Sequence, residues 1–109
     1  MSVFGTNDLD PIIHGKLRLG LMAYLASVGS ASFVTLREKT NSTDGNLSTH
    51  LSKLEDAGYI KINKQFEGRK PLTLVLLSKV GRVAWIGYLN QMQALLHGQE
   101  LHGQELDGQ

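Results

Sequence analysis

The sequence contains no cysteine, two prolines and few aromatic residues among its 109 positions. The absence of cysteine excludes disulfide bonds, thiolate metal sites and thiol nucleophiles, and it fits a reducing compartment, so we expect a cytoplasmic protein. The longest apolar stretch, 17–28, is interrupted by Arg18, Gly20 and Ser27 and is too short to span a bilayer. Residues 1–10 carry no basic side chain, so we expect neither a signal nor a transit peptide, and no membrane association.

Signatures of catalysis are missing as well. The sequence has no Walker-type loop, no dinucleotide fingerprint and no nucleophile elbow. The spacing of the histidines does not favour a metal site, because His97 and His102 are five residues apart and do not share one helix face. We therefore expect no enzyme, no metal and no cofactor. A metal or small-ligand sensor remains a weaker alternative, and no effector is predicted.

The charges are distributed unevenly although the formal net charge is only +1. Between Tyr59 and Arg82 the only acidic residue is Glu67, whereas from Val83 onward all charged residues are acidic. The basic residues of the first of these segments are Lys61, Lys64, Arg69, Lys70, Lys79 and Arg82. This local basic patch, rather than the net charge, points toward nucleic acid.

The length and the patterning predict one domain at 9–96, after a polar segment at 1–8 and before a disordered tail at 97–109, HGQELHGQELDGQ. Within the domain we expect helices at about 12–28, 34–40, 43–57 and 78–96, a short strand at 30–32, and strands near 60–63 and 72–77. Asp10-Pro11, Thr43 and Ser78 are helix-start signals, and Gly58 is a helix-end signal. The fold class is α+β, mainly helical: a winged helix-turn-helix with a two-stranded wing and a C-terminal dimerisation helix.

The helix at 43–57 has one apolar face and one polar face. Leu47, Leu51 and Leu54 fall within a narrow arc, which predicts that they attach the helix to the core. The polar side suits base edges and phosphates, since asparagine can bind adenine through two hydrogen bonds. His50 lies at the border and either contacts DNA or bonds inside the domain. The residues of this helix that we expect to contact DNA in the major groove are Thr43, Gly45, Asn46, Ser48, Thr49, His50, Ser52 and Lys53.

The connection between the two strands is polar and basic. Lys64, Arg69 and Lys70 surround Gly68, and we expect this wing, 64–71, to lie along phosphates or in the minor groove. Phe66 is either a packing residue or an exposed group at the tip.

Two alternatives to DNA binding remain open at this point. The polar helix face and the basic loop are also typical of ordinary solvated surface, and the domain could be a winged-helix protein–protein interaction module that does not bind DNA.

Apolar residues on the first and last helices exceed what a small core needs. We expect a homodimer in which both helices contribute to the interface; the alternative is a monomer whose core is anchored by Trp85. The interface residues that we expect are Ile12, Leu19, Met22, Trp85, Leu89, Met92 and Leu96.

Several segments resemble a known group of proteins. The run from Thr43 to Ile60, TDGNLSTHLSKLEDAGYI, resembles the recognition helix of small winged-helix regulators related to the MarR and ArsR families. The segments 68–73, 77–82 and 9–14 are similar to their wing, their wing-to-helix junction and the opening of short members. The resemblance covers roughly 9–96 and implies a dimeric transcriptional regulator that binds double-stranded DNA. Without cysteine the chain lacks the thiolate metal-sensor site of many ArsR proteins, and it lacks the extra terminal helices of MarR proteins.

Overall fold

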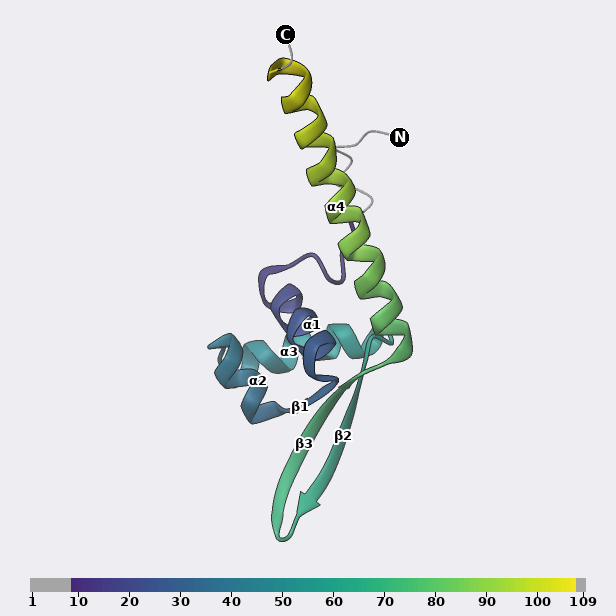
Figure 1. The fold of residues 1–109 in the computed structure, drawn as a ribbon. Helices are drawn as coiled ribbons and strands as arrows, with labels where there is room; N and C mark the ends of the chain where they lie inside the picture. Colours follow the sequence, from purple (N-terminus) through teal and green to yellow (C-terminus); the bar gives the residue numbers. More distant parts are fainter. Residues whose placement is uncertain (1–8, 108–109) are drawn as a thin grey trace.

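The structure, a computed structural model, describes residues 9–107, with side chains through His97; the polar segment at 1–8 lies outside this part. The described chain is elongated, 68 × 24 × 22 Å. A long helix projects from one end and a β-hairpin from the other, with three shorter helices between them (Figure 1). The elements are α1 (Lys16–Val28), β1 (Ser30–Ser32), α2 (Phe33–Thr40), α3 (Asp44–Asp56), β2 (Ile60–Glu67), β3 (Lys70–Leu77) and α4 (Lys79–Asp107). This arrangement confirms the predicted winged helix-turn-helix, mainly helical with a small sheet.

The first helix begins at Lys16 and not near Ile12, where we expected it. The Asp10 carboxylate accepts a hydrogen bond from the Ile12 amide at 2.8 Å, as a helix cap would. This bond closes only a turn, and α1 begins after Gly15, whose backbone is extended. The turn still contributes to the hydrophobic core, because Leu9 and Ile13 are buried in it. The predicted start signal was therefore real, but it begins a turn that leads into the helix.

The core surrounds α1, which contacts every other helix and two of the strands. Its buried residues come from the turn before α1, from all four helices and from the base of the hairpin: Leu9, Ile13, Leu21, Met22, Leu25, Leu36, Leu47, Leu51, Leu54, Ile60, Val75 and Tyr88. Met22, which we expected at a dimer interface, is 0% exposed within this core. That assignment was wrong, because the second apolar strip of a central helix is covered by the protomer's own elements.

The three strands form an antiparallel sheet in the order β1-β3-β2. β2 and β3 pair from Ile60↔Leu77 to Glu67↔Lys70, so the connecting loop is Gly68-Arg69 and is shorter than the connection between the strands that we expected near 60–63 and 72–77. Gly68 has a φ of 64°, which suits a tight turn. Pro71 lies within β3, where β1 no longer pairs with it. A proline is tolerated there because that edge of the strand has no further partner.

The last helix begins after Ser78, as predicted, and the Ser78 hydroxyl accepts a hydrogen bond from the Gly81 amide at 2.9 Å. It continues to Asp107, past Leu96, so the tail predicted to be disordered is helical in the structure as far as Asp107. Extending an existing helix adds one hydrogen bond per residue without a new nucleation cost. The glycines of the tail cost only about 1 kcal/mol each relative to alanine. In the part of the chain that is described, no helix is long and apolar enough to cross a membrane.

Candidate nucleic-acid interface

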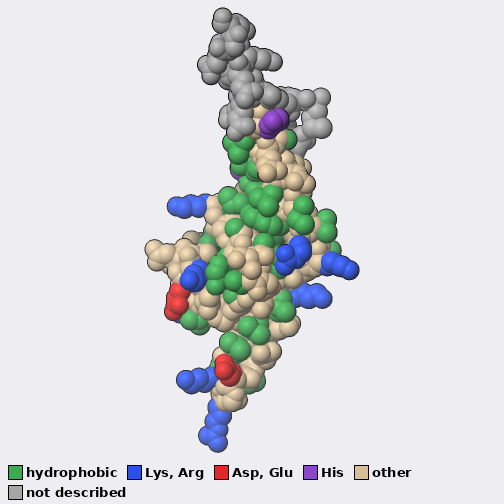
Figure 2. All heavy atoms as spheres, in the orientation of Figure 1, with side chains coloured by type: hydrophobic (Ala, Val, Ile, Leu, Met, Phe, Trp, Pro, Cys, Tyr) green, Lys and Arg blue, Asp and Glu red, His purple; other side chains and the backbone are tan. Residues whose placement is uncertain are grey.

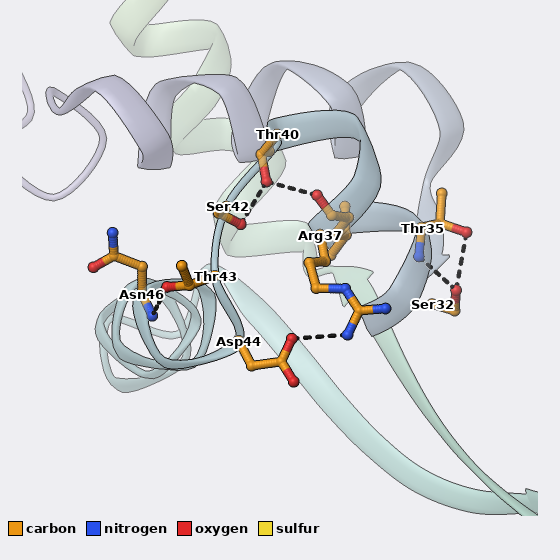
Figure 3. A network of polar contacts seen from close by, with 9 residues as sticks. Ser32, Thr35, Arg37, Thr40, Ser42, Thr43, Asp44 and Asn46 are labelled. Carbon is orange, nitrogen blue, oxygen red and sulfur yellow. Dashed lines mark hydrogen bonds and ion pairs between the residues drawn. The ribbon is translucent and has the colours of Figure 1, made fainter.

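Side chains cap both helices of the helix-turn-helix (Figure 3). The Ser32 hydroxyl accepts a hydrogen bond from the Thr35 amide at 3.1 Å, and the Thr43 hydroxyl accepts one from the Asn46 amide at 3.2 Å. Asn41 adopts a left-handed conformation with a φ of 51°, which ends α2. These local interactions fix where α2 and α3 begin and where α2 ends, and so they define the limits of the turn between the two helices.

An ion pair crosses the turn. Arg37 donates to the Asp44 carboxylate at 2.8 Å, and this hydrogen bond raises the pKa of Arg37. Asp44 occupies the first turn of α3, where a free carboxylate would repel a phosphate. Because both side chains are exposed to solvent, the pair adds little stability. It does place a compensating cation beside the acidic side chain at the N-terminus of α3.

The outer face of α3 is open to solvent. Leu47, Leu51 and Leu54 are buried, as predicted. Of the residues expected to contact DNA, all those on α3 and its cap except His50 are exposed: Thr43, Gly45, Asn46, Ser48, Thr49, Ser52 and Lys53. Thr49 donates its hydroxyl hydrogen to the Gly45 carbonyl at 2.9 Å, so toward a ligand it can only accept. The side-chain amide of Asn46 makes no hydrogen bond to any described residue and keeps its donor and acceptor available.

His50 is half-buried and bonded inside the domain. Arg18 Nη1 lies 2.8 Å from His50 Nδ1, and Arg18 Nε donates to the Ile12 carbonyl at 2.6 Å. Because a guanidinium only donates, Nδ1 is the acceptor and the hydrogen of the neutral ring lies on Nε2. Burial, followed by the charges of Arg18 and Lys53, lowers the pKa of His50. Of the two alternatives for His50, the structure therefore shows the bond inside the domain, which uses Nδ1. The Nε2–H group is a hydrogen-bond donor.

A groove of about 770 Å³ separates α3 from the hairpin. It is lined by Phe33, Ser48, Leu51, Ser52, Glu55, Ile62, Lys64 and Thr73. The structure thus brings two predicted residues of α3, Ser48 and Ser52, next to the predicted wing residue Lys64. Glu55 was not predicted to belong to the interface, and its carboxylate lines the same groove. Arg69 and Lys70 lie farther out, in the exposed tip of the hairpin, where Figure 2 shows basic side chains.

A second groove, of about 940 Å³, lies on the other side of α3. It is lined by α1, the end of α2 and the start of α3, and it contains two lysines that sequence reasoning missed. Lys16 and Lys39 both line it together with Asn46 and His50, and Lys39 Nζ lies 5.9 Å from the centre of the Tyr24 ring. The polar face of α3 is therefore flanked by lysines on both sides, although only the hairpin lysines stood out as a cluster in the sequence.

Long-range polar contacts hold the supporting elements together. Tyr59 donates a short hydrogen bond to Asp10, and burial, reinforced by this bond and the negative charge, raises the pKa of Tyr59 to about 12. His14 Nδ1 lies 2.8 Å from the hydroxyl of Tyr88, whose ring stacks on Trp85. These contacts attach the N-terminal turn to the end of α3 and to α4. No sequence spacing indicated them.

Apart from Met22, which is fully buried, the residues expected at a dimer interface divide into two groups. Ile12, Leu19, Trp85 and Met92 are half-buried against the protomer's own core. Leu89 and Leu96 are exposed, and so are three further apolar residues of α4 that we had not selected, Val80, Val83 and Ile86.

The winged helix DNA-binding domain family model matches residues 17–96 of the chain. A Methanocaldococcus jannaschii protein that carries no functional name is 33% identical over 84 residues, which cover 77% of this chain and 91% of that protein. The family match ends at residue 96, before the end of α4.

Solved structures show the same fold. A transcriptional regulator homologue from Pyrococcus horikoshii has a TM-score of 0.78 and 27% identity, covering 89% of this chain and 92% of that one. NadR, solved with 4-hydroxyphenylacetate, has a TM-score of 0.65 at 19% identity and covers 87% of this chain and 70% of its own. An ArsR family transcriptional regulator has a TM-score of 0.56 at 23% identity, covering 79% and 84%. The last two are similar in fold alone.

Proposed function

Because the chain belongs to the winged helix DNA-binding domain family, we propose that it is a dimeric transcriptional regulator that binds specific double-stranded DNA sequences. The observation that carries this proposal is the exposed polar face of α3, which is seated by three buried leucines and lies beside a basic hairpin. The similarity to a regulator homologue at 27% identity supports it. A protein with this activity must share a compartment with DNA, and the proposal keeps the cytoplasmic location expected above.

In the proposed complex α3 enters the major groove. Its first turns carry small or hydrogen-bonding side chains, so the helix can approach the base edges closely. Asn46 is the strongest candidate for reading a base, because its amide is exposed and unbonded within the described residues. A bidentate contact between asparagine and adenine contributes about 1–3 kcal/mol of discrimination. Thr49, whose hydroxyl already donates to Gly45, would accept a bond or pack its methyl group against thymine.

The hairpin supplies phosphate contacts. Lys64, Arg69 and Lys70 are exposed along its outer half, where Glu67 is the one acidic side chain. Each phosphate neutralised releases counterions and contributes about −0.9 to the slope of log K against log salt concentration. Three such contacts together predict a contribution of roughly −2.7 to that slope. Lys16 and Lys39, on the other side of α3, add candidates for the opposite strand.

We propose that α4 forms the dimer contact. With 29 residues it extends about 43 Å at the usual rise of 1.5 Å per residue, well beyond the domain that it covers (Figure 1). Its solvent side carries Val83, Ile86, Leu89 and Leu96, each more than 40% exposed. Pairing two copies along this side would bury these residues and would give a two-fold assembly. Two recognition helices about 34–36 Å apart would then read a near-palindromic site.

Selection of genomic fragments from sheared DNA by the full-length protein tests the proposal. We expect enriched fragments to share a near-palindromic motif. Asn46→Ala should lose about 1–3 kcal/mol on the enriched motif and much less on unrelated duplexes. Asn63→Ala, the same substitution at an exposed position on the face of β2 that points away from the groove beside α3, is the matched control and should bind as the unchanged protein does. If no duplex fragment is enriched above background at low salt, the proposed function is wrong.

A further inference from the structure

Phe66 is the most exposed large hydrophobic side chain in the described part of the protein, at 73%. It lies one residue before the end of β2, opposite Pro71 in the hairpin register. The hairpin tip therefore has an apolar pair at a place where the protomer provides nothing to cover it. The structure thus settles the alternative left open by the sequence: Phe66 is an exposed tip residue and not a packing residue.

The side of the hairpin on which Phe66 lies follows from strand alternation. Residues directly opposite one another in antiparallel strands point to the same face. The pair Ile62↔Val75 reaches the core, and the next pair, Lys64↔Thr73, lines the groove beside α3. The pair Phe66↔Pro71 comes next on the same face. The apolar tip therefore lies on the side of the wing that faces α3.

The reach of the hairpin suits a neighbouring groove of DNA. From Ile62 to Gly68 the strand advances six residues, or about 20 Å at roughly 3.3 Å per residue. Half a turn of B-DNA, which separates a major groove from the next minor groove, is about 17 Å. When α3 occupies the major groove and the hairpin runs along the DNA axis, its length is therefore sufficient for the tip to reach the adjacent minor groove. Lys64, Arg69 and Lys70 surround the tip, and their charge is complementary to the phosphates on both sides of that groove.

We propose that Phe66 enters this minor groove as an apolar wedge that partly unstacks one base step and bends the DNA. The inference rests on the proposed function and adds a second mode of recognition to it. Apolar side chains inserted between base steps kink a duplex by about 20–90° toward the major groove. Pyrimidine–purine steps such as TA and CA/TG deform most easily. The wedge therefore makes the protein prefer such a step outside the bases that α3 reads.

The test uses a duplex fragment obtained from the genomic selection, with 2-aminopurine at the step expected beneath the wing and a donor–acceptor dye pair at its ends. When the full-length protein saturates this duplex, we expect the 2-aminopurine fluorescence to rise several-fold. We also expect the distance between the two dyes at the ends of the duplex to shorten. Phe66→Ser should remove both signals, whereas Phe66→Leu should retain part of each. Lys64→Ala is the control from the same strand: it should weaken binding but leave the bend unchanged at saturation.

The outcomes separate this inference from the proposed function. Because Phe66 is exposed, its substitution should leave the thermal midpoint unchanged, and a melting curve verifies that each variant is folded. If Phe66→Ser bends the DNA and unstacks the step as the unchanged protein does, the wedge is refuted while DNA binding stands. If the unchanged protein binds no duplex at all, the proposed function fails first and the wedge with it.

Discussion

Replacing Gly81 by alanine should destabilise the fold, although alanine is the better helix former. A Cβ atom built on Gly81 would lie 2.0 Å from the carbonyl oxygen of Tyr59. Real Cβ contacts essentially never fall below 3.0 Å, so the start of α4 and the end of the loop after α3 must separate by about 1 Å. That movement pulls apart the Ser78 amide and the Tyr59 carbonyl, which are hydrogen-bonded at 3.0 Å.

The magnitude follows from three contributions. The hydrogen bonds from Ser78 to Tyr59 and to Gly58 contribute about 1 kcal/mol each. The overpacking itself costs about 1–3 kcal/mol. The higher helix propensity of alanine offsets about 1 kcal/mol of this. We therefore expect Gly81→Ala to lower the free energy of unfolding by about 2–4 kcal/mol, equivalent to a drop of about 10 °C or more in Tm for a domain of this size.

Gly87→Ala is the matched control, because it makes the same substitution in the same helix with no heavy atom within 4 Å of the new Cβ. It should raise stability by up to about 1 kcal/mol. Urea unfolding of both variants, at a protein concentration where sedimentation shows only monomer, measures the difference without a contribution from dimerisation. If Gly81→Ala is as stable as Gly87→Ala, the close contact between α4 and Tyr59 is not a constraint of the fold and the reasoning is refuted.

Three further predictions concern the supporting contacts and the assembly. Folding raises the pKa of Tyr59 from an ordinary value of 10.0 to about 12. The stabilisation by the protonated Tyr59 hydroxyl is therefore complete below pH 10 and is lost as the pH rises toward 12. Tyr59→Phe should flatten the curve of unfolding free energy against pH between these two values. Arg18→Gln should raise the pKa of His50 measured by NMR titration, because the neighbouring positive charge is removed; an unchanged pKa would show that Arg18 has no electrostatic influence on the ring. Leu89→Lys on the exposed side of α4 should shift sedimentation toward the monomer without lowering monomer stability, whereas Val28→Lys, also at an exposed apolar position, should not; equal dimerisation in both variants would exclude α4 as the interface.

Local patterns predicted much of this fold. The spacing of Leu47, Leu51 and Leu54 predicted the orientation of α3, and the capping residues Thr43 and Ser78 predicted where α3 and α4 begin. These features depend on residues within a few positions of one another, so the sequence carries them directly. The alternation around Ile60 and Ile62 likewise predicted the base of the hairpin, because burial on one face imposes a period of two.

The predictions that were wrong concern features that depend on nonlocal packing or on the cooperativity of helix formation. The hairpin extends to Glu67 because its two strands continue to pair beyond the core, where no apolar alternation marks them. The helix pattern alone fits Met22 equally well to the core and to an interface. Met22 is in the core because the other helices pack around α1, which only the tertiary structure shows. The glycine repeat of the tail suggested disorder, but propagation from a long packed helix carries α4 through it.

The candidate site could be predicted as a set of exposed residues but not as an arrangement. The polar positions of α3 followed from the helical pattern, and the wing cations followed from the local charge. The bond between Arg18 and His50 joins residues 32 positions apart, and no spacing rule indicates it. The grooves on the two sides of α3 likewise depend on tertiary structure, which places Glu55 in one of them and Lys39 in the other.

Duplex binding as a function of salt concentration tests the central claim most directly. Fluorescence polarisation with a labelled duplex should show affinity that falls steeply from 50 to 200 mM salt. The variant in which Lys64, Arg69 and Lys70 are all alanine should bind more weakly, and the magnitude of its log–log slope should be smaller by roughly 2.7. An affinity for duplex that does not change with salt, or a slope that is the same with and without these three cations, would contradict the assignment of α3 and the hairpin as a DNA-binding surface.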